Sequence, residues 1–165
     1  SGRGLLKRDP PPEHFMVINF TKLNRYAQIP EELEDCRRPV FVLRSAEDCQ
    51  INPLEWKEVS VGLTMFLPPK CIARVHQHPE LFEKECMISP QIFSQSAELK
   101  VNIFNTRFPI EFLIGKNTNA PGLGAAKSRA SFFGSVNCAQ FKQGEAIGFL
   151  TIEKTESVSI KEVGI

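Results

Sequence analysis

One stretch near the middle of the chain constrains the fold more than any other. Between residues 58 and 67, apolar side chains alternate with small or polar ones. The apolar members are Val59, Val61, Leu63 and Met65. A period of two is typical of a β-strand that buries one face. Pro68-Pro69 then ends the strand, because proline fixes φ and lacks the N–H that a sheet requires. The stretch therefore predicts a half-buried strand followed by a turn.

The rest of the chain predicts further short strands. They are expected at Phe15–Phe20, Pro39–Leu43, Cys49–Ile51, Cys71–Val75, Glu98–Asn105, Phe108–Ile114, Ala146–Ile152 and Val158–Ile160. Pro109 places its strand at a sheet edge or next to a bulge. The charged run Glu31–Arg38 is expected to be a solvated loop or one helical turn. Many short strands separated by turns predict an all-β domain, either a barrel or a sandwich.

Length and composition predict the domain organisation. The 165 residues, 42% hydrophobic and 24% charged, fit one ordinary globular domain. Residues 1–14, basic and rich in proline, are expected to be a flexible arm, and residues 15–165 a single β domain. Residues 115–140 contain few strand-like patterns and many glycines, serines and alanines, so they predict a long loop insertion.

Charge and cysteine usage exclude several classes of function. A formal net charge of +1 gives no reason to expect nucleic acid as a partner. No apolar run is long enough to span a membrane. The five cysteines are widely spaced and form no CxxC pair, which predicts reduced thiols and an intracellular protein, in the cytoplasm, the nucleus or both.

Metal and thiol chemistry have one candidate cluster. His76 and His78 point to the same face of a strand, and Cys71 and Cys86 are near them in the sequence. Their spacing matches no standard zinc motif, so surface histidines are the favoured interpretation. A Cys71–His76 nucleophile pair is equally unsupported, because nothing identifies a third group or an oxyanion hole.

Six segments stand in the order of a known family. They are Thr21–Pro30, Val40–Asp48, Ile51–Pro53 with Val59–Leu63, Leu67–Val75, Glu98–Asn105 and Gln143–Leu150. Taken together, they resemble the trimeric dUTP pyrophosphatases, or dUTPases, from about Phe20 to Leu150, apart from the loop after Ile114. Each piece is short, and the order of the six makes the resemblance specific. It implies a jelly-roll-like β fold and active sites built at the interfaces of a homotrimer.

The sequence departs from the family where the phosphates and magnesium should be held. In the first motif, Val42 takes the place of an aspartate that helps to hold the magnesium and phosphate end of the site. In the second, His78, Pro79 and Glu80 take the place of an Arg-Ser-Gly sequence that contacts phosphates. After Ile152 there is no glycine-rich arm to close over a triphosphate.

The third and fourth motifs also depart from the family pattern. Around Ile92, Phe93 and Gln95, the chain lacks the aspartate that activates water and the tyrosine that lies under the deoxyribose. In the fourth motif Glu145 keeps an acidic group, but Phe149 replaces a glutamine. Triphosphate hydrolysis needs magnesium ligands, donors for developing charge and a base that orients water. We therefore expect no catalytic residue, cofactor or metal, and a fold retained without the enzyme activity.

Three surfaces are candidates for binding a partner. They are the residues around His78–Glu80, the C-terminal Val163 and Ile165, and a loop with Lys116, Lys127, Arg129, Phe132 and Phe133. The apolar C-terminus suits strand addition to the groove of a PDZ domain. The chain resembles the dUTPase-related proteins of adenoviruses, of the early-region type, and of herpesviruses. That resemblance implies a viral factor that binds host proteins and redirects signalling, trafficking or immune responses.

Two other functions stay open. A diverged nucleotide pyrophosphohydrolase would use other acids, such as Glu80, Glu83 and Glu145. A structural oligomerisation module would retain only the homotrimer of the family. Release of pyrophosphate from dUTP would distinguish the first alternative, and a mass measurement in solution the second.

Overall fold

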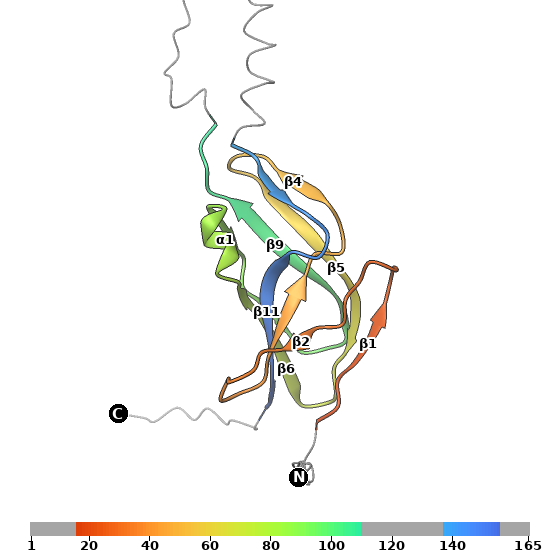
Figure 1. Cartoon of the computed structure of the whole chain (residues 1–165). Helices are drawn as coiled ribbons and strands as arrows, with labels where there is room; N and C mark the ends of the chain where they lie inside the picture. The colour runs from red at the N-terminus through yellow and green to blue at the C-terminus, as the bar shows by residue number, and fades with distance from the viewer. Residues whose placement is uncertain (1–15, 110–136, 156–165) are drawn as a thin grey trace, which may run out of the picture.

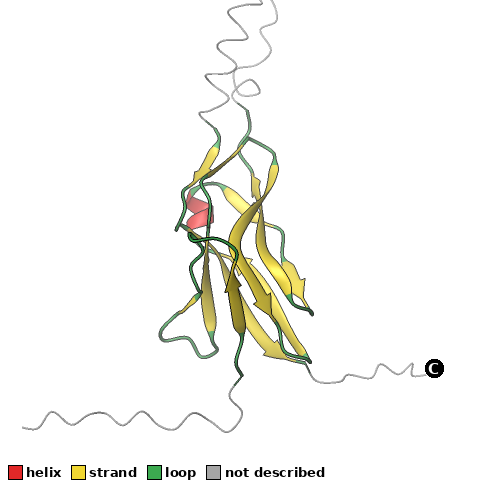
Figure 2. Ribbon diagram, turned by 90° about the vertical axis from the view of Figure 1, so that its right-hand side faces the viewer, coloured by secondary structure: helices red, strands yellow, loops and turns green. Residues whose placement is uncertain are grey.

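The computed structural model describes residues 16–109 and 137–155, which form two antiparallel sheets that face each other (Figures 1 and 2). The first sheet has four strands. In spatial order they are β1 (Asn19–Lys22), β5 (Trp56–Phe66), β9 (Ala97–Asn105) and β7 (Cys86–Ile88). β5 is the longest of the described strands, and it contains the alternating stretch on which the sequence prediction rested.

The second sheet has five strands. In spatial order they are β2 (Glu31–Glu32), β3 (Val40–Arg44), β11 (Ala146–Lys154), β6 (Cys71–Gln77) and β8 (Gln91–Phe93). A small third sheet pairs β10 (Ala139–Phe141) with β4 (Cys49–Ile51). The single-turn helix α1 (Glu80–Glu83) lies beside the sandwich, between β6 and β7 in the chain. These strands confirm the predicted all-β fold.

The core lies between the inner faces of the two large sheets. The four apolar residues of the alternating stretch in β5 are fully buried, as are Leu99 and Ile103 of β9. Across the core, Ala73 of β6 and Leu150 of β11 are also fully buried. The two sheets are in contact at Gly148 of β11, since a Cβ there would lie 3.7 Å from Val101 Cγ2 of β9, an ordinary van der Waals distance. Periodic burial of this kind confirms that the period of two was interpreted correctly.

Gly62 gives β5 a local irregularity that the alternation does not predict. Its φ is +71°, and the pairing of β5 with β9 shifts register between Ser60 and Thr64. A Cβ at this position would lie 2.8 Å from Ala46 Cβ and 2.9 Å from Ala27 Cβ. Only glycine avoids both the steric conflict and the strain of a positive φ.

Several predicted boundaries were wrong. The first strand is Asn19–Lys22 rather than Phe15–Phe20, because it pairs with the end of β5. The charged run contains a two-residue strand, Glu31–Glu32, which adds to the edge of β3. Phe108 and Pro109 are not in a strand, and an Asn105 Oδ1 bond to the Arg107 amide (3.1 Å) turns the chain there.

The segment between β6 and β9, which the sequence analysis left without structure, contains α1, β7 and β8. The predicted loop insertion at 115–140 overlaps strand β10, which begins at Ala139. Residues 115–136 of that loop lie outside the described residues, together with the predicted arm 1–14, the residues 110–114 of one predicted strand, and the predicted strand 158–160. No helix among the described residues has the length and apolar character needed to cross a membrane.

Candidate functional site

Three of the residues that the resemblance places at motif positions come together at the second sheet. Val42 of β3 lies opposite Phe149 of β11, and the His78 ring packs against the Phe149 ring with 4.6 Å between centroids. Leu150, the next residue along β11, is fully buried in the core, so Phe149 lies on the outer face of the sheet. Val42 is nevertheless buried. The site at this position is therefore an apolar and aromatic cluster.

This cluster does not fit a magnesium ion. Mg²⁺ takes an octahedral set of oxygen ligands, of which proteins usually supply one or two carboxylates. The side chains of Val42 and Phe149 supply no oxygen, and the nearby His76 is hydrogen-bonded to the Thr151 hydroxyl (2.8 Å). Within residues 16–109 and 137–155, no three His, Cys, Asp or Glu side chains are grouped so that they would hold a metal.

His78, Pro79 and Glu80 form the start of α1. Pro79 occupies the N-cap, and the Glu80 amide donates to His78 Nδ1 (3.2 Å). Leu81 is fully buried and fixes the helix against the sandwich. The Glu80 side chain is exposed and has no ion pair with any described residue. Residues His78–Glu80 thus form a surface turn next to the aromatic cluster.

Glu145, the acidic residue at the fourth motif position, forms an ion pair within the chain. Its carboxylate is ion-paired with Lys84, and both side chains are about one-third exposed. Lys84 also donates to the Gln140 carbonyl (2.5 Å), and its ammonium lies 4.3 Å from the centre of the Phe141 ring. Glu145 therefore takes part in a contact that holds the end of α1 against β10. For Glu145 to act as a catalytic acid or base in a diverged hydrolase, its ion pair with Lys84 would have to break.

Ile92, Phe93 and Gln95 are on or next to β8, an edge strand of the second sheet. Two strands, β6 and β11, separate β8 from β3, so these residues do not join the Val42 cluster within one chain. Ile92 is 64% exposed, whereas Phe93 packs against the core. Gln95 is exposed just after the strand.

The cysteines and histidines do not form a catalytic pair. Cys71 is buried on the core side of β6, and His76 is exposed on the other side of that strand. Burial raises the pKa of the Cys86 thiol to about 11, although Arg107 and Lys84 lower it in part. A thiol with such a pKa stays protonated at neutral pH and is a poor nucleophile.

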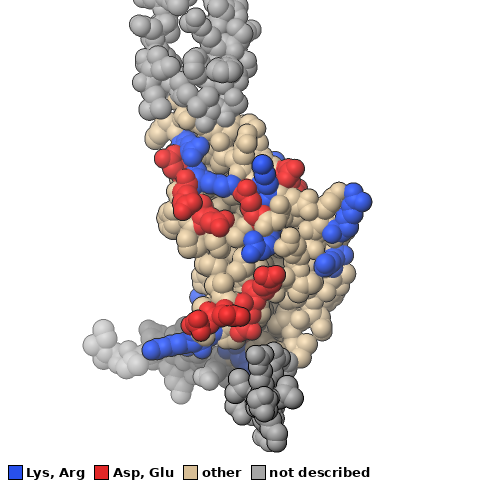
Figure 3. Space-filling model, in the orientation of Figure 1, with Lys and Arg blue, Asp and Glu red and all other residues tan. Residues whose placement is uncertain are grey.

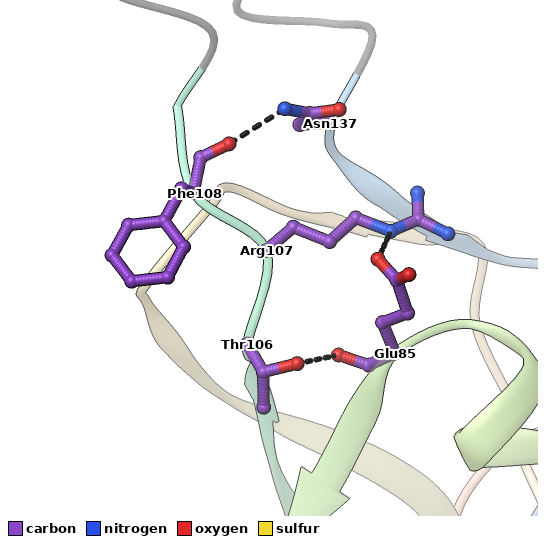
Figure 4. Close-up of a pocket in the computed structure, with 5 residues that line it drawn as sticks. All are labelled: Glu85, Thr106, Arg107, Phe108 and Asn137. Carbon is purple, nitrogen blue, oxygen red and sulfur yellow. Dashed lines mark hydrogen bonds and ion pairs between the residues drawn. The ribbon is translucent and has the colours of Figure 1, made fainter. Parts of the chain in front are cut away.

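A pocket of about 420 Å³ that the sequence analysis missed lies at the far end of the first sheet (Figure 4). Its lining residues are Glu85, Thr106, Arg107, Phe108 and Asn137. Arg107 Nε donates to Glu85 Oε2 (2.8 Å), and the Thr106 hydroxyl donates to the Glu85 carbonyl (2.6 Å). Glu85 has a φ of +53°, which is uncommon for a residue with a side chain. The polar groups of this pocket are thus largely satisfied by one another.

Asn105 holds the two chain segments that border the pocket. Its Nδ2 donates to the carbonyls of Ile51 (3.0 Å) and Asn137 (2.8 Å), and Asn137 Nδ2 in turn donates to the Phe108 carbonyl (2.6 Å). Asn105 is fully buried. The sequence could have indicated that Asn105 is a buried polar residue. Leu99, Val101, Ile103 and Asn105 share the inward face of β9, and only Asn105 is polar.

The face drawn in Figure 3 carries charges of both signs. Acidic side chains gather over its lower part, and acidic and basic ones alternate over its upper part. The remaining candidates for binding a partner are Lys116, Lys127, Arg129, Phe132, Phe133, Val163 and Ile165, and they lie outside the described residues.

Comparison with known proteins identifies the fold. No protein-family model and no curated protein match the chain. Among solved structures, the dUTPase of Staphylococcus bacteriophage 80alpha is similar with a TM-score of 0.67 and 15% identity, over 89% of this chain and 96% of that one. The dUTPase from phage phi11 of S. aureus gives a TM-score of 0.67 and 15% identity, over 90% and 96% of the two chains. The likeness shows that the chain has the dUTPase-like β fold.

Proposed function

We propose, from a fold shared with the phage dUTPases, that this chain is a catalytically inactive dUTPase-like protein that acts as an interaction module. In this proposal it is a viral factor that binds host proteins inside the cell and redirects signalling, trafficking or immune responses. The observation that supports the loss of activity is the cluster of Val42, His78 and Phe149. An apolar cluster offers neither ligands for magnesium nor donors for phosphate.

The remaining acid at the replaced motifs supports the same proposal. Glu145 is paired with Lys84, so its charge already has a partner. Loss of one donor for developing charge costs an enzyme about 10²–10³ in kcat, and residues that act as a unit are lost together. A chain that lacks several such groups retains little of the rate.

Incubation of the purified chain with dUTP and magnesium tests the enzyme side of the proposal. We expect no pyrophosphate above the background hydrolysis of dUTP, with the phage 80alpha dUTPase as positive control. Magnesium-dependent release of pyrophosphate that Glu145→Gln or Glu80→Gln abolishes would contradict the proposal. That result would support the diverged nucleotide pyrophosphohydrolase instead.

Affinity purification from infected or transfected cells tests the interaction side. The intact chain is compared with a variant that lacks residues 163–165 and with one in which residues 116–137 are replaced by a neutral linker. We expect a stoichiometric host protein with the intact chain, and its loss in one of the variants would identify the binding surface. Loss with the tail deletion would indicate a PDZ domain as partner.

We also propose that the chain forms a homotrimer, as the resemblance to the trimeric dUTPases implies. The exposed Ile92 on edge strand β8 supports this proposal, because a subunit contact would remove it from water. If a trimer forms and no host protein binds, the chain is a structural oligomerisation module.

A further inference from the structure

The outer face of the first sheet carries an exposed apolar row at one end. Trp56 of β5, Phe104 of β9 and Met87 of β7 lie opposite one another across three neighbouring strands. Trp56 is 51% exposed and Met87 45% exposed. The Trp56 and Phe104 rings are in contact, with 4.8 Å between their centroids. Adjacent strands are about 4.8 Å apart, so the row is about 10 Å wide.

Beside this row, the outer face of the sheet is polar. The inward neighbours Val59 and Ile103 are fully buried, which shows that the row faces away from the core. One step along the outer face, Glu58 lies opposite Asn102. An outer face of an antiparallel sheet normally carries such polar residues, so exposed Trp, Phe and Met side by side require a reason.

Two ion pairs within the chain lie beside the row. Lys100 Nζ and Glu58 Oε2 are 3.8 Å apart on the outer face next to the row. Where β9 ends and β7 begins, Arg107 is paired with Glu85. The border of the row therefore offers no unpaired charge to a partner from these four side chains.

We propose that the row of Trp56, Phe104 and Met87 is the central contact for a protein partner that presents an uncharged apolar surface. The inference rests on the proposed function as an interaction module. Tryptophan is enriched among the residues that dominate binding energy, and methionine adapts to the shape of apolar partners. Because Lys100 is paired with Glu58 and Arg107 with Glu85, the partner gains most from apolar side chains, and binding depends little on salt.

Site-specific photo-crosslinking tests the proposal in the intact 165-residue chain. A benzophenone amino acid replaces Trp56 in one variant and Phe66 in the other, and both are expressed in cultured cells. Phe66 is the matched control, because it lies at the other end of β5 and is 48% exposed. We expect a cross-link to a host protein from position 56 but not from position 66, on a peptide with apolar side chains.

Binding of the purified cross-linked protein then measures the contribution of the row. We expect Trp56→Ser to weaken binding by about 30-fold or more, and Phe66→Ser to change it by less than about twofold. The affinity of the intact chain should change by less than about threefold between low and high salt. Circular dichroism checks that both variants are folded.

The other outcomes separate this inference from the proposed function. A partner that cross-links only from position 66, or from neither position while it still co-purifies, overturns the row as its contact and leaves the interaction function intact. So does a cross-link from position 56 to a second copy of the chain or to its own residues 110–136. A steep salt dependence overturns the uncharged partner. If no protein binds the intact chain, the proposed function and this inference both fail.

Discussion

Asn105 is a buried residue that joins the backbone segments next to the pocket. It is one of two buried polar residues among those described, and its side chain bonds three backbone groups from three segments. A buried amide of this kind is stabilising only because every partner is present. One side chain therefore joins the backbone segments around the pocket through its hydrogen bonds.

Asn105→Leu should lower the free energy of unfolding by about 2–4 kcal/mol. The substitution keeps the number and branching of the side-chain heavy atoms, but leaves the Ile51 carbonyl and the Arg107 amide without their partner. Urea unfolding measures the change. Asn102→Leu on the same strand is the control and should cost less than about 0.5 kcal/mol, because Asn102 is on the outer face. Equal effects of both substitutions would contradict the role of Asn105.

Gly62→Ala should destabilise the chain by about 2 kcal/mol or more. The new Cβ meets Ala46 and Ala27 inside normal contact distance, at a positive φ. Gly144→Ala separates the two causes, since its φ is +87° but its Cβ has only Gln28 nearby at 3.5 Å. We expect about 1 kcal/mol for Gly144→Ala, which reflects the backbone conformation alone. Thermal unfolding of both variants measures the difference, and equal losses would argue against a steric role for Gly62.

Cys86 should make stability fall in alkaline solution. Burial raises its pKa from 9.0 to about 11, so the folded state holds the proton more tightly than the unfolded state. The resulting stabilisation is complete below about pH 9 and is lost as the pH rises towards 11. Between pH 8 and about 10.5, the native chain should lose about 2 kcal/mol more than Cys86→Ala. Cys36→Ala, at an exposed thiol, is the control and should follow the native chain.

A side-chain amide joins strands β6 and β7 at the edge of the first sheet. Gln77, the last residue of β6, donates from Nε2 to the Cys86 carbonyl (3.3 Å) and accepts the Ile88 amide at Oε1 (3.3 Å). The amide thus occupies the outer edge of β7 and joins the second sheet to the first. An edge strand with free backbone groups invites pairing with other chains, and Gln77 satisfies those groups here.

Gln77→Val should release the edge of β7. Without the amide, the Ile88 N–H is expected to exchange with solvent about tenfold faster, because a hydrogen bond of this kind contributes about 1.4 kcal/mol or less. Hydrogen exchange measured on peptides that cover residues 86–88 reports the change. Gln140→Val in β10 is the control, since that exposed side chain supports no comparable edge. Protection that stays unchanged in Gln77→Val would contradict the role of the amide.

Elements with strong local patterns were predictable, and elements fixed by distant contacts were not. The alternation in β5 and the apolar run in β3 were sufficient to predict both strands. By contrast, β7 and β8 have three residues each and form only because β9 and β6 supply their partners. Strand β2 consists of two glutamates, whose sequence favours solvent, and it exists through its pairing with β3.

The same limit applies to the candidate site. That His78 and Phe149 meet follows from the register of β11 with β6 and from the turn into α1, which no local pattern specifies. The resemblance to the dUTPases had already placed both residues at motif positions. Nothing local predicted the ion pair of Glu145 with Lys84, since the two residues are far apart in the sequence.

At the scale of the whole molecule, light scattering after size exclusion should give about three times the chain mass of 18.6 kDa. Ile92→Glu should reduce the mass to that of one chain, because a charge on the exposed edge strand β8 opposes an apolar subunit contact. Met87→Glu, on the other sheet, is the control and should keep the trimer. A single-chain mass for the native protein would contradict the proposed homotrimer.

The hydrogen bond between Asn137 and Phe108 has a consequence for protein engineering. The described residues stop at Pro109 and resume at Asn137, and this bond of 2.6 Å joins the two segments there. The ends of these two segments lie at the end of the sandwich opposite to the start of β1 and the end of β11 (Figure 1). The free-energy cost of closing a loop rises by only about 0.6 kcal/mol for each doubling of its length. The sandwich should therefore accept a foreign domain inserted between Pro109 and Asn137. The fold thus provides a position at which the inserted sequence can change while the sandwich stays the same.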